Sequence, residues 1–271
     1  MPRELARPGW EPVGYHIVFR LEGDRSIATE PAELRDGARA LYDIGRRYGL
    51  LAFRFVDTHL HTVHVCGRRE AGLFARYAAS SLRWRLALRS PFEPSRFRPV
   101  LDRGHLYNTV RYVFRQEEHH GAPLDPDHEG SSLPELLGLR VGGEAVVDRV
   151  RRTLPRLTRD ELLDRLGARG LDATPPCFDA LGTAAAAAVG IRDLHGADPR
   201  ALVARRAAVH AAGPALTTAV LAAVLEITPR AVQRLRVRPT ERTLVRAVVL
   251  QMRLRALRAA AAGPRALAGA I

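Results

Sequence analysis

The chain contains no lysine, only two cysteines and no long apolar segment. Cys66 and Cys177 are far apart and form no Cys-x-x-Cys pair. This excludes a disulfide scaffold and a cysteine zinc site, and it favours a reducing cytoplasm. No run approaches the roughly 18 uncharged apolar residues of a membrane span, and the first residues lack the apolar core of a signal peptide. We therefore expect a cytoplasmic protein without a membrane partner.

The positive charge is concentrated in the last quarter of the chain. The 271 residues carry a formal net charge of +13, and all 42 basic residues are arginine. Residues 1–150 hold 22 arginines against 20 acidic residues, 151–198 hold 7 against 7, and 199–271 hold 13 against 2, a local excess of +11. Such asymmetry indicates a polyanionic partner, most simply nucleic acid. The alternative is a solvated arginine-rich surface set by the codon usage of a GC-rich genome.

Hydrophobic patterning predicts an α+β fold for the first half of the chain. Aromatic and β-branched residues predict strands over 14–21, 50–57, 58–67 and, more briefly, near 97–100. Apolar residues at helical spacing predict helices over 31–48, 69–88 and 104–117. This order predicts a small antiparallel sheet with helices on one face, a ferredoxin-like plan.

Everything from about residue 133 onward lacks strand patterning and is expected to be helical. The predicted organisation has three parts: an α+β domain over 1–150, a neutral helical connector over 151–198, and a basic all-α domain over 199–271.

Two histidines on the third predicted strand form the first candidate site. Side chains at positions i and i+2 project from the same face of a strand, so His59 and His61 can converge on one metal ion while Leu60 enters the core. Neutral imidazole suits divalent transition ions. On its own such a pair is more often structural. His64 lies on the opposite face and is expected to be a satisfied core or surface histidine.

Tyr112 and Gln116 share a face of the predicted helix 104–117, because residues four apart are neighbours on a helix surface. A tyrosine hydroxyl can attack a phosphate, and an amide oxygen can complete a metal site that accepts Mg²⁺ or Mn²⁺. Taken singly, Tyr112 would be an amphipathic core aromatic and Gln116 a solvated polar residue. Tyr107 is the rival nucleophile, but its fourth neighbour is Arg111, which cannot ligate a metal.

Together these residues resemble a known family. Residues 10–138 are similar to the single-tyrosine HUH transposases of the IS200/IS605 group, and within it to the REP-associated tyrosine transposases. The supporting segments are YHIVFR at 15–20, RRYGLLAFRFVDTHLHTVHV at 46–65, RYVFRQ at 111–116 and GSSLPELLG at 130–138. The Trp-Gln-Gly-Arg-like segment common before the tyrosine helix is not evident around 97–106, which leaves the target hairpin open.

The resemblance implies a ferredoxin-like nuclease that cuts single-stranded DNA beside a hairpin through a 5′-phosphotyrosine intermediate. It implies that His59, His61 and Gln116 bind a divalent metal, Mg²⁺ or Mn²⁺, and that Tyr112 is the nucleophile. Members of this family usually act as dimers, so a homodimer is expected on the same ground.

The basic region contains a candidate helix-turn-helix over 217–236, TTAVLAAVLEITPRAVQRLR. Thr228 and Pro229 suit the N-cap and first position of its second helix. Glu226 stands where such turns often have glycine. The residues expected to contact duplex DNA in this domain are Arg205, Arg206, Arg230, Gln233, Arg234 and Arg236. The arrangement loosely resembles the duplex-binding domain of the chromosomal replication initiator, and the alternative is a plain helical hairpin.

Three functions remain open from the sequence. The leading one is a nucleoid-associated bacterial enzyme that cleaves and rejoins DNA and carries an accessory duplex-binding module. The second is a domesticated, non-catalytic DNA-binding regulator, which would have no need of all four site residues. The third is a metal-dependent phosphodiesterase acting on small nucleotides, which would need neither a tyrosine nucleophile nor a basic tail.

Overall fold

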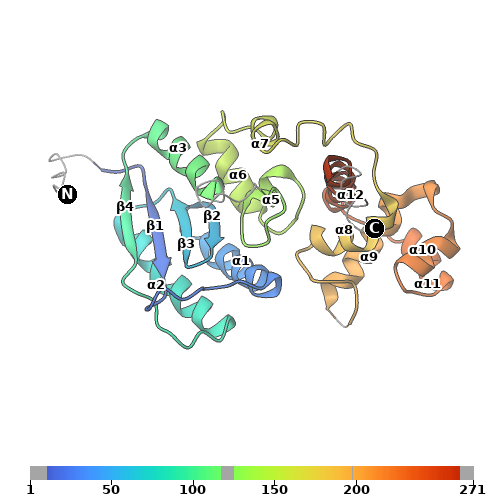
Figure 1. Ribbon diagram of the computed structural model, residues 1–271, viewed down its shortest axis with the longest axis horizontal. Helices are drawn as coiled ribbons and strands as arrows, with labels where there is room; N and C mark the ends of the chain where they lie inside the picture. The colour runs from blue at the N-terminus through green and yellow to red at the C-terminus, as the bar shows by residue number, and fades with distance from the viewer. Residues whose placement is uncertain (1–10, 117–124, 197, 263–271) are drawn as a thin grey trace, which may run out of the picture. The chain divides into compact units, whose positions relative to one another are not determined.

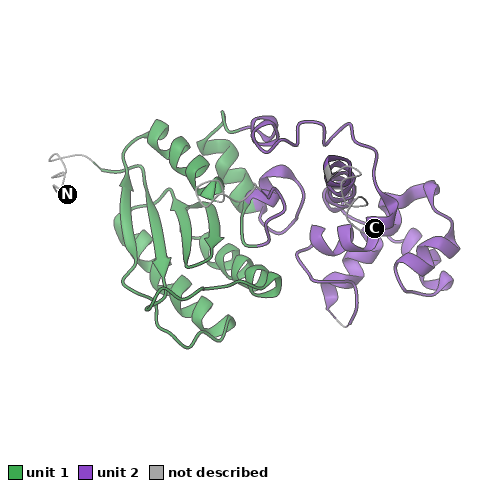
Figure 2. Ribbon diagram, viewed as in Figure 1, with its two compact units in different colours: residues 1–124, 130–132, 145–157 green, residues 125–129, 133–144, 158–271 purple. Residues whose placement is uncertain are grey.

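The computed structural model describes residues 11–116, 125–196 and 198–262, and it is α+β, as predicted. The chain divides into two compact units (Figure 2). Unit 1 comprises residues 1–124, 130–132 and 145–157, and unit 2 comprises residues 125–129, 133–144 and 158–271.

Unit 1 is built on a four-stranded antiparallel sheet with the order β2-β3-β1-β4 (Figure 1). Its strands are β1 (Gly14–Arg20), β2 (Leu50–Val56), β3 (His59–His64) and β4 (Arg96–Val100). All four match predicted strands. The two central strands, β1 and β3, are not consecutive in the chain, and their pairing brings residues 15–20 beside residues 59–64. This pairing positions the candidate site.

Helices cover both faces of this sheet. They are α1 (Pro31–Gly45), α2 (Arg68–Arg85) and α3 (Arg103–Phe114). Phe74 of α2 packs against Phe19 and His64 on one face, with ring centroids 6.2 and 4.0 Å apart. Tyr112 of α3 contacts His61, whose side chain lies on the other face because strand residues alternate. The expectation of helices on one face only is therefore wrong for α3.

Coverage of both faces explains the burial of the strands. All six residues of β3 are buried, including the histidines, and Phe19, Phe53, Phe55 and Phe74 are at most 2% exposed. Burying each such ring stabilises the fold by about 1.5–3 kcal/mol. The alternation of Leu60 with His59 and His61 is thus not an alternation of core and solvent. Leu60 points into one buried layer and the histidines into another.

The edge strand β2 is covered by two later parts of unit 1. Ser131 forms a bridge with Arg54, and the hydroxyl of Ser132 accepts a hydrogen bond from the backbone N–H of Phe53. Helix α6 (Glu144–Thr153) contributes Arg149, which donates to the main-chain carbonyls of Leu50 and residue 46. These contacts protect the edge, which would otherwise expose unpaired backbone groups.

The regular secondary structure in the described part of unit 2 is all helical, with loops between the helices. Its helices are α5 (Leu133–Leu137), α7 (Arg159–Arg165), η1 (Phe178–Ala180), α8 (Leu181–Ala188), α9 (Pro199–Ala212), η2 (Gly213–Ala215), α10 (Thr218–Val224), α11 (Pro229–Arg236) and α12 (Arg242–Ala262). Helices α8, α9 and α12 pack against one another around an alanine-rich core. None of the described helices combines the length and apolar character needed to cross a membrane.

Candidate active site and nucleic-acid interface

The two predicted metal ligands lie side by side on β3. His59 and His61 are 9% and 4% exposed, and their ring centroids are 4.5 Å apart. In each ring the Nδ1 atom is engaged by the protein: that of His59 lies 3.2 Å from the Thr58 hydroxyl, and that of His61 lies 2.8 Å from Nε2 of His16. Both rings are thereby oriented through the same nitrogen.

His16 is part of this site although sequence reasoning gave it no role. Its ring stacks on that of His61 with centroids 5.1 Å apart. The two residues meet because β1 pairs with β3 so that His16 and His61 project from one face of the sheet. The segment YHIVFR contains His16, but only the strand pairing shows that it contacts His61.

The Nε2 atom of His61 is buried and has no hydrogen-bond partner among the residues that the structure describes. If His61 donates its Nδ1–H to His16, this Nε2 carries an unused lone pair; if His16 donates, it carries an unused N–H. Either state leaves a buried polar atom unsatisfied, which costs about 1–3 kcal/mol. Burial, and then the neighbouring His16, lower the pKa of His61 to about 2, so its imidazole is neutral at pH 7.

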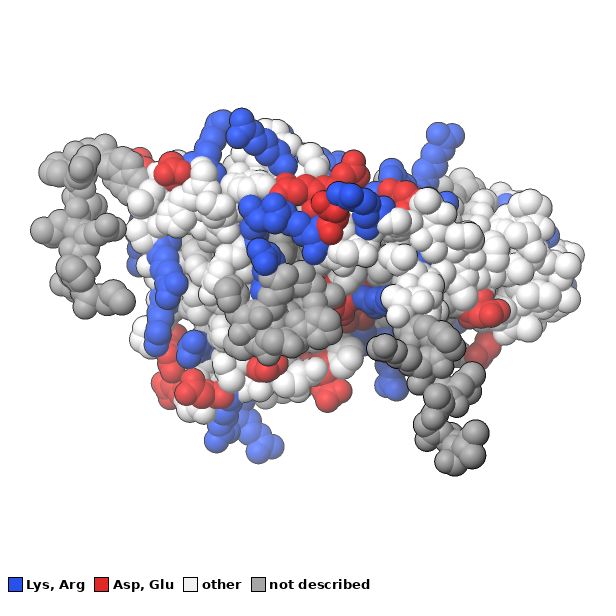
Figure 3. Space-filling view, turned by 45° about the horizontal axis from the view of Figure 1, so that its top comes forward, with Lys and Arg blue, Asp and Glu red and all other residues white. Residues whose placement is uncertain are grey.

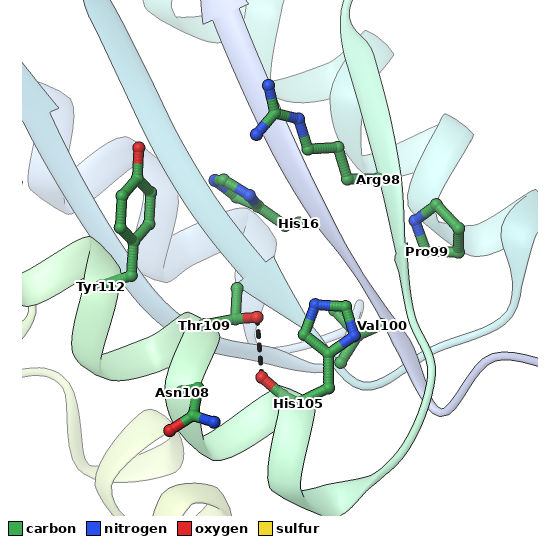
Figure 4. A pocket seen from close by; sticks show the side chains of 8 residues that line it. All are labelled: His16, Arg98, Pro99, Val100, His105, Asn108, Thr109 and Tyr112. Atoms are coloured by element: carbon green, nitrogen blue, oxygen red, sulfur yellow. Dashed lines mark hydrogen bonds between the residues drawn. The ribbon is translucent and has the colours of Figure 1, made fainter. Parts of the chain in front are cut away.

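Tyr112 lies next to these histidines on α3. Helix α3 begins after Asp102, whose carboxylate accepts a hydrogen bond from the backbone N–H of His105. The Tyr112 ring centroid is 6.1 Å from that of His16 and 5.9 Å from that of His61. The side chain is 39% exposed and lines a cavity of about 300 Å³ (Figure 4). Tyr112 is therefore accessible to a ligand while touching the histidine cluster.

The side chain of Gln116 folds back to contact the main chain of Tyr112. Helix α3 ends at Phe114, so Gln116 lies beyond the helix in which it was predicted. Its amide nitrogen donates to the main-chain carbonyl of Tyr112 over 3.3 Å, and the residue is 2% exposed. The amide nitrogen is engaged in this hydrogen bond, so the amide oxygen is the side-chain atom that would bind a metal ion.

Arg54 supports the end of the tyrosine helix. It lies on β2 directly opposite His61 and is 1% exposed. Its Nη1 donates to the main-chain carbonyl of Phe114 over 3.3 Å. A cation at the C-terminus of a helix interacts favourably with the helix dipole. Sequence reasoning missed Arg54, because an arginine in an apolar strand gives no sign of what it will contact.

The donor atoms of this site meet part of what a divalent metal ion requires. Among the residues that the structure describes, no group of three or more His, Cys, Asp or Glu side chains is placed to hold a metal ion. The predicted ligand set has two histidines and one glutamine, and so contains only two residues of these types. The unpartnered, neutral Nε2 of His61 is the kind of donor that a metal ion would satisfy.

The candidate helix-turn-helix forms a well-defined turn between α10 and α11. The N–H groups of Glu226 and Ile227 donate to the carbonyls of Ala223 and Ala222, and Glu226 has φ +51°. This is the Schellman arrangement that ends a helix. Thr228 then caps α11 by accepting from Ala231 N–H over 3.2 Å. The predicted cap is confirmed.

The six predicted DNA-contacting residues divide into two groups. Arg230, Gln233 and Arg234 are exposed and lie three and four residues apart, on one face of α11. The other three make internal hydrogen bonds: Arg205 to the Leu194 carbonyl, Arg206 to the Pro239 carbonyl, and Arg236 to Thr218 and the Leu216 carbonyl.

Figure 3 shows the surface charge on one face of the molecule. Arginine and acidic side chains are interspersed there rather than gathered in one basic patch. Because three of the six predicted DNA-contacting residues make internal hydrogen bonds, the exposed face of α11 is a more specific candidate for DNA binding than the local excess of +11 in residues 199–271.

Comparison of the chain with protein-family models, with curated protein sequences and with solved structures finds no match. The candidate site is accordingly interpreted from its own geometry.

Proposed function

We propose that the protein is a metal-dependent single-stranded DNA endonuclease and strand transferase that acts through a tyrosine nucleophile. The observation that carries this proposal is the convergence of an accessible tyrosine with a buried histidine cluster, one of whose nitrogens has no hydrogen-bond partner in the described part of the chain. Strand order β2-β3-β1-β4 supports a ferredoxin-like plan for unit 1. The expected resemblance to the HUH transposases stays part of the proposal.

In the proposed reaction the Tyr112 oxygen attacks a phosphodiester phosphorus. A bond forms between that oxygen and phosphorus, the bond from phosphorus to the 3′ oxygen breaks, and the phenolic proton is balanced by the proton gained by the 3′ hydroxyl. The DNA 5′ end is then held as a phosphotyrosine, and attack by a 3′ hydroxyl reverses the step. A bound Mg²⁺ or Mn²⁺ would supply Lewis-acid polarisation of the phosphate.

The residues of the chain have separate tasks in this reaction. His59, His61 and the Gln116 amide oxygen would hold the metal, and His16 would orient His61 through Nδ1. Arg54 holds the C-terminal end of α3 and thus fixes the position of the Tyr112 helix.

Helix α11 would bind flanking duplex DNA through Arg230, Gln233 and Arg234. Arginine can hydrogen-bond guanine and glutamine can hydrogen-bond adenine in the major groove. The exposed face of α11 supports this part of the proposal independently of the tyrosine site. A protein with this face and no cleavage activity would be the DNA-binding regulator. A homodimer is proposed on the family resemblance alone.

Covalent trapping tests the proposal. The full chain is incubated with Mg²⁺ or Mn²⁺ and end-labelled single-stranded hairpin oligonucleotides from the sequence flanking the gene, and the products are run on a denaturing gel. We expect an adduct that disappears with chelator and in Tyr112→Phe. The matched control is Tyr107→Phe: Tyr107 is on the same helix, with the Arg111 guanidinium 5.2 Å from its ring centroid, and it does not line the cavity.

The outcomes separate the hypotheses. An adduct that survives Tyr112→Phe but is lost in Tyr107→Phe would move the chemistry to the rival tyrosine. Absence of any adduct together with tight retention of duplex DNA would contradict the nuclease and favour the regulator. Hydrolysis of small nucleotides without an adduct would favour the phosphodiesterase.

A further inference from the structure

The cavity beside Tyr112 extends away from the metal-ligand candidates, towards the edge of the sheet. Its described lining comes from three elements: β1 contributes His16, β4 contributes Arg98, Pro99 and Val100, and α3 contributes His105, Asn108, Thr109 and Tyr112. Figure 4 shows Arg98 extending from β4 towards His16, with Tyr112 on the other side of that ring. His59, His61 and Gln116 are not among these lining residues.

The charge of the described lining has one sign. It contains the guanidinium of Arg98 and no carboxylate. No acidic side chain of the described residues forms an ion pair with Arg98, whereas Arg96 on the same strand lies 3.8 Å from Glu93. An anion entering the cavity would therefore meet the Arg98 guanidinium, which pairs with none of the described carboxylates.

The lining residues of α3 are spaced to face one ligand. His105, Asn108 and Tyr112 are three and four residues apart and so share a face of the helix. The Nδ1 atom of His105 accepts a hydrogen bond from the backbone N–H of Leu101 over 3.1 Å. In neutral His105 the proton must then be on Nε2, which makes this ring nitrogen a donor. The amide of Asn108 offers further N–H donors.

We propose that this cavity binds a phosphodiester group of the DNA strand next to the one that Tyr112 attacks, with Arg98, His105 and Asn108 as the binding residues. The inference rests on the proposed function, since it takes Tyr112 as the neighbour of the scissile phosphate. A volume of about 300 Å³ is at the lower end for ligand sites and suits one phosphate with its sugar. The subsite would set the direction in which the strand crosses the tyrosine.

Histidine NMR on the full chain tests this binding locally. Protein with ¹³C-labelled histidine rings is titrated with a thymidine dinucleotide carrying a 5′ phosphate, and the His105 signals are assigned by their loss in His105→Gln. We expect saturable shifts of the His105 and His16 signals. Arg98→Ala should raise the dissociation constant about 10-fold or more, because hydrogen bonds to charged groups are the strong ones. Arg98→Lys should restore part of the affinity.

Arg96→Ala is the matched control, since it removes an arginine two residues away on the same strand, outside the cavity. It should leave the dissociation constant within about 2-fold. Unmoved His105 signals at millimolar dinucleotide, or equal effects of the two alanine variants, would overturn the subsite.

This readout does not depend on cleavage. Arg98-dependent binding without any covalent adduct would leave the anion site standing and refute the nuclease. A covalent adduct without shifts of the His105 signals would support the nuclease and refute the anion site.

Discussion

Replacement of Glu226 by glycine is expected to stabilise unit 2. Glu226 is one of three described non-glycine residues with positive φ, and it occupies the left-handed position of the turn between α10 and α11. There its Cβ crowds the following carbonyl oxygen, a cost of about 1–2 kcal/mol for an ordinary residue. Glycine avoids this cost, and the two hydrogen bonds of the turn involve only backbone atoms.

The net gain is smaller than the strain relieved. Glycine adds conformational freedom to the unfolded chain, and this stabilisation of the unfolded state offsets about 0.5–1 kcal/mol of the gain. The Glu226 carboxylate also lies 3.5 Å from Nδ1 of His195, but both side chains are more than 60% exposed, so this pair contributes little. We expect Glu226→Gly to raise the free energy of unfolding by about 1 kcal/mol and the melting temperature by about 2–4 °C.

Urea unfolding followed by circular dichroism measures this change, and amide hydrogen exchange in α10 and α11 localises it. Glu226→Ala is the matched control, because it removes the pair with His195 but keeps Cβ and hence the strain. The reasoning is refuted if the alanine variant is stabilised as much as the glycine variant, since the carboxylate and not the backbone would then be the cause. A destabilised glycine variant would also refute it.

Two further predictions concern buried titratable groups. His16→Phe removes the hydrogen bond to His61, so we expect calorimetric titration to show about 10–100-fold weaker Mn²⁺ binding with an unchanged circular dichroism spectrum; unchanged affinity would show that His16 does not orient His61. Burial raises the pKa of Asp127 to about 6, against a Gln251 hydrogen bond that lowers it. The stability contributed by this folded-state shift is complete below about pH 4 and is lost as the pH rises through about 6, by up to ~3 kcal/mol. Urea unfolding should therefore show Asp127→Asn gaining stability relative to the native chain between pH 5 and pH 8, and a constant difference would contradict the assignment.

The secondary structure of unit 1 was largely predictable from local pattern. Each predicted strand was found, and the helices expected over 31–48, 69–88 and 104–117 occur over 31–45, 68–85 and 103–114. Each of the three ends three residues early. After α1 and α2 the backbone changes to hydrogen bonds between residues three apart, from Arg47 to Ile44, from Tyr48 to Gly45 and from Ala87 to Trp84, which local pattern does not predict. For Gln116 this matters, since it lies past the end of α3 and reaches Tyr112 through its side chain instead.

What local pattern does not give is which elements cover which face. In the segment THLHTVHV, apolar Leu60 stands between polar His59 and His61, which is typical of a strand with one solvated face. Here the polar face is also buried, because α3 packs on it. Neither the strand nor the helix alone specifies that contact.

Charge counting identified the basic region but not the role of each arginine in it. Arg205 and Arg206 belong to α9, where their side chains reach the main-chain carbonyls of Leu194 and Pro239. A guanidinium has five donors in a fixed arrangement, so it can satisfy carbonyls at helix and loop ends as well as it can satisfy phosphate. Only the positions of those carbonyls distinguish the two uses, and these are set by the tertiary fold.

The same reasoning explains why the tyrosine site contains residues that no spacing rule would select. His16 lies on β1, 45 residues before His61 in the chain, whereas Arg54 lies on β2, which directly precedes β3; the sheet order places both strands next to β3. The register of the strand pairing then determines what these side chains contact. Arg54 lies opposite His61, and His16 lies opposite Val63, which is two residues after His61 on the same face of β3. A one-residue slip of either pairing would turn these side chains to the face covered by α1 and α2. The candidate site therefore depends on the register of the central strands as much as on the identity of its residues.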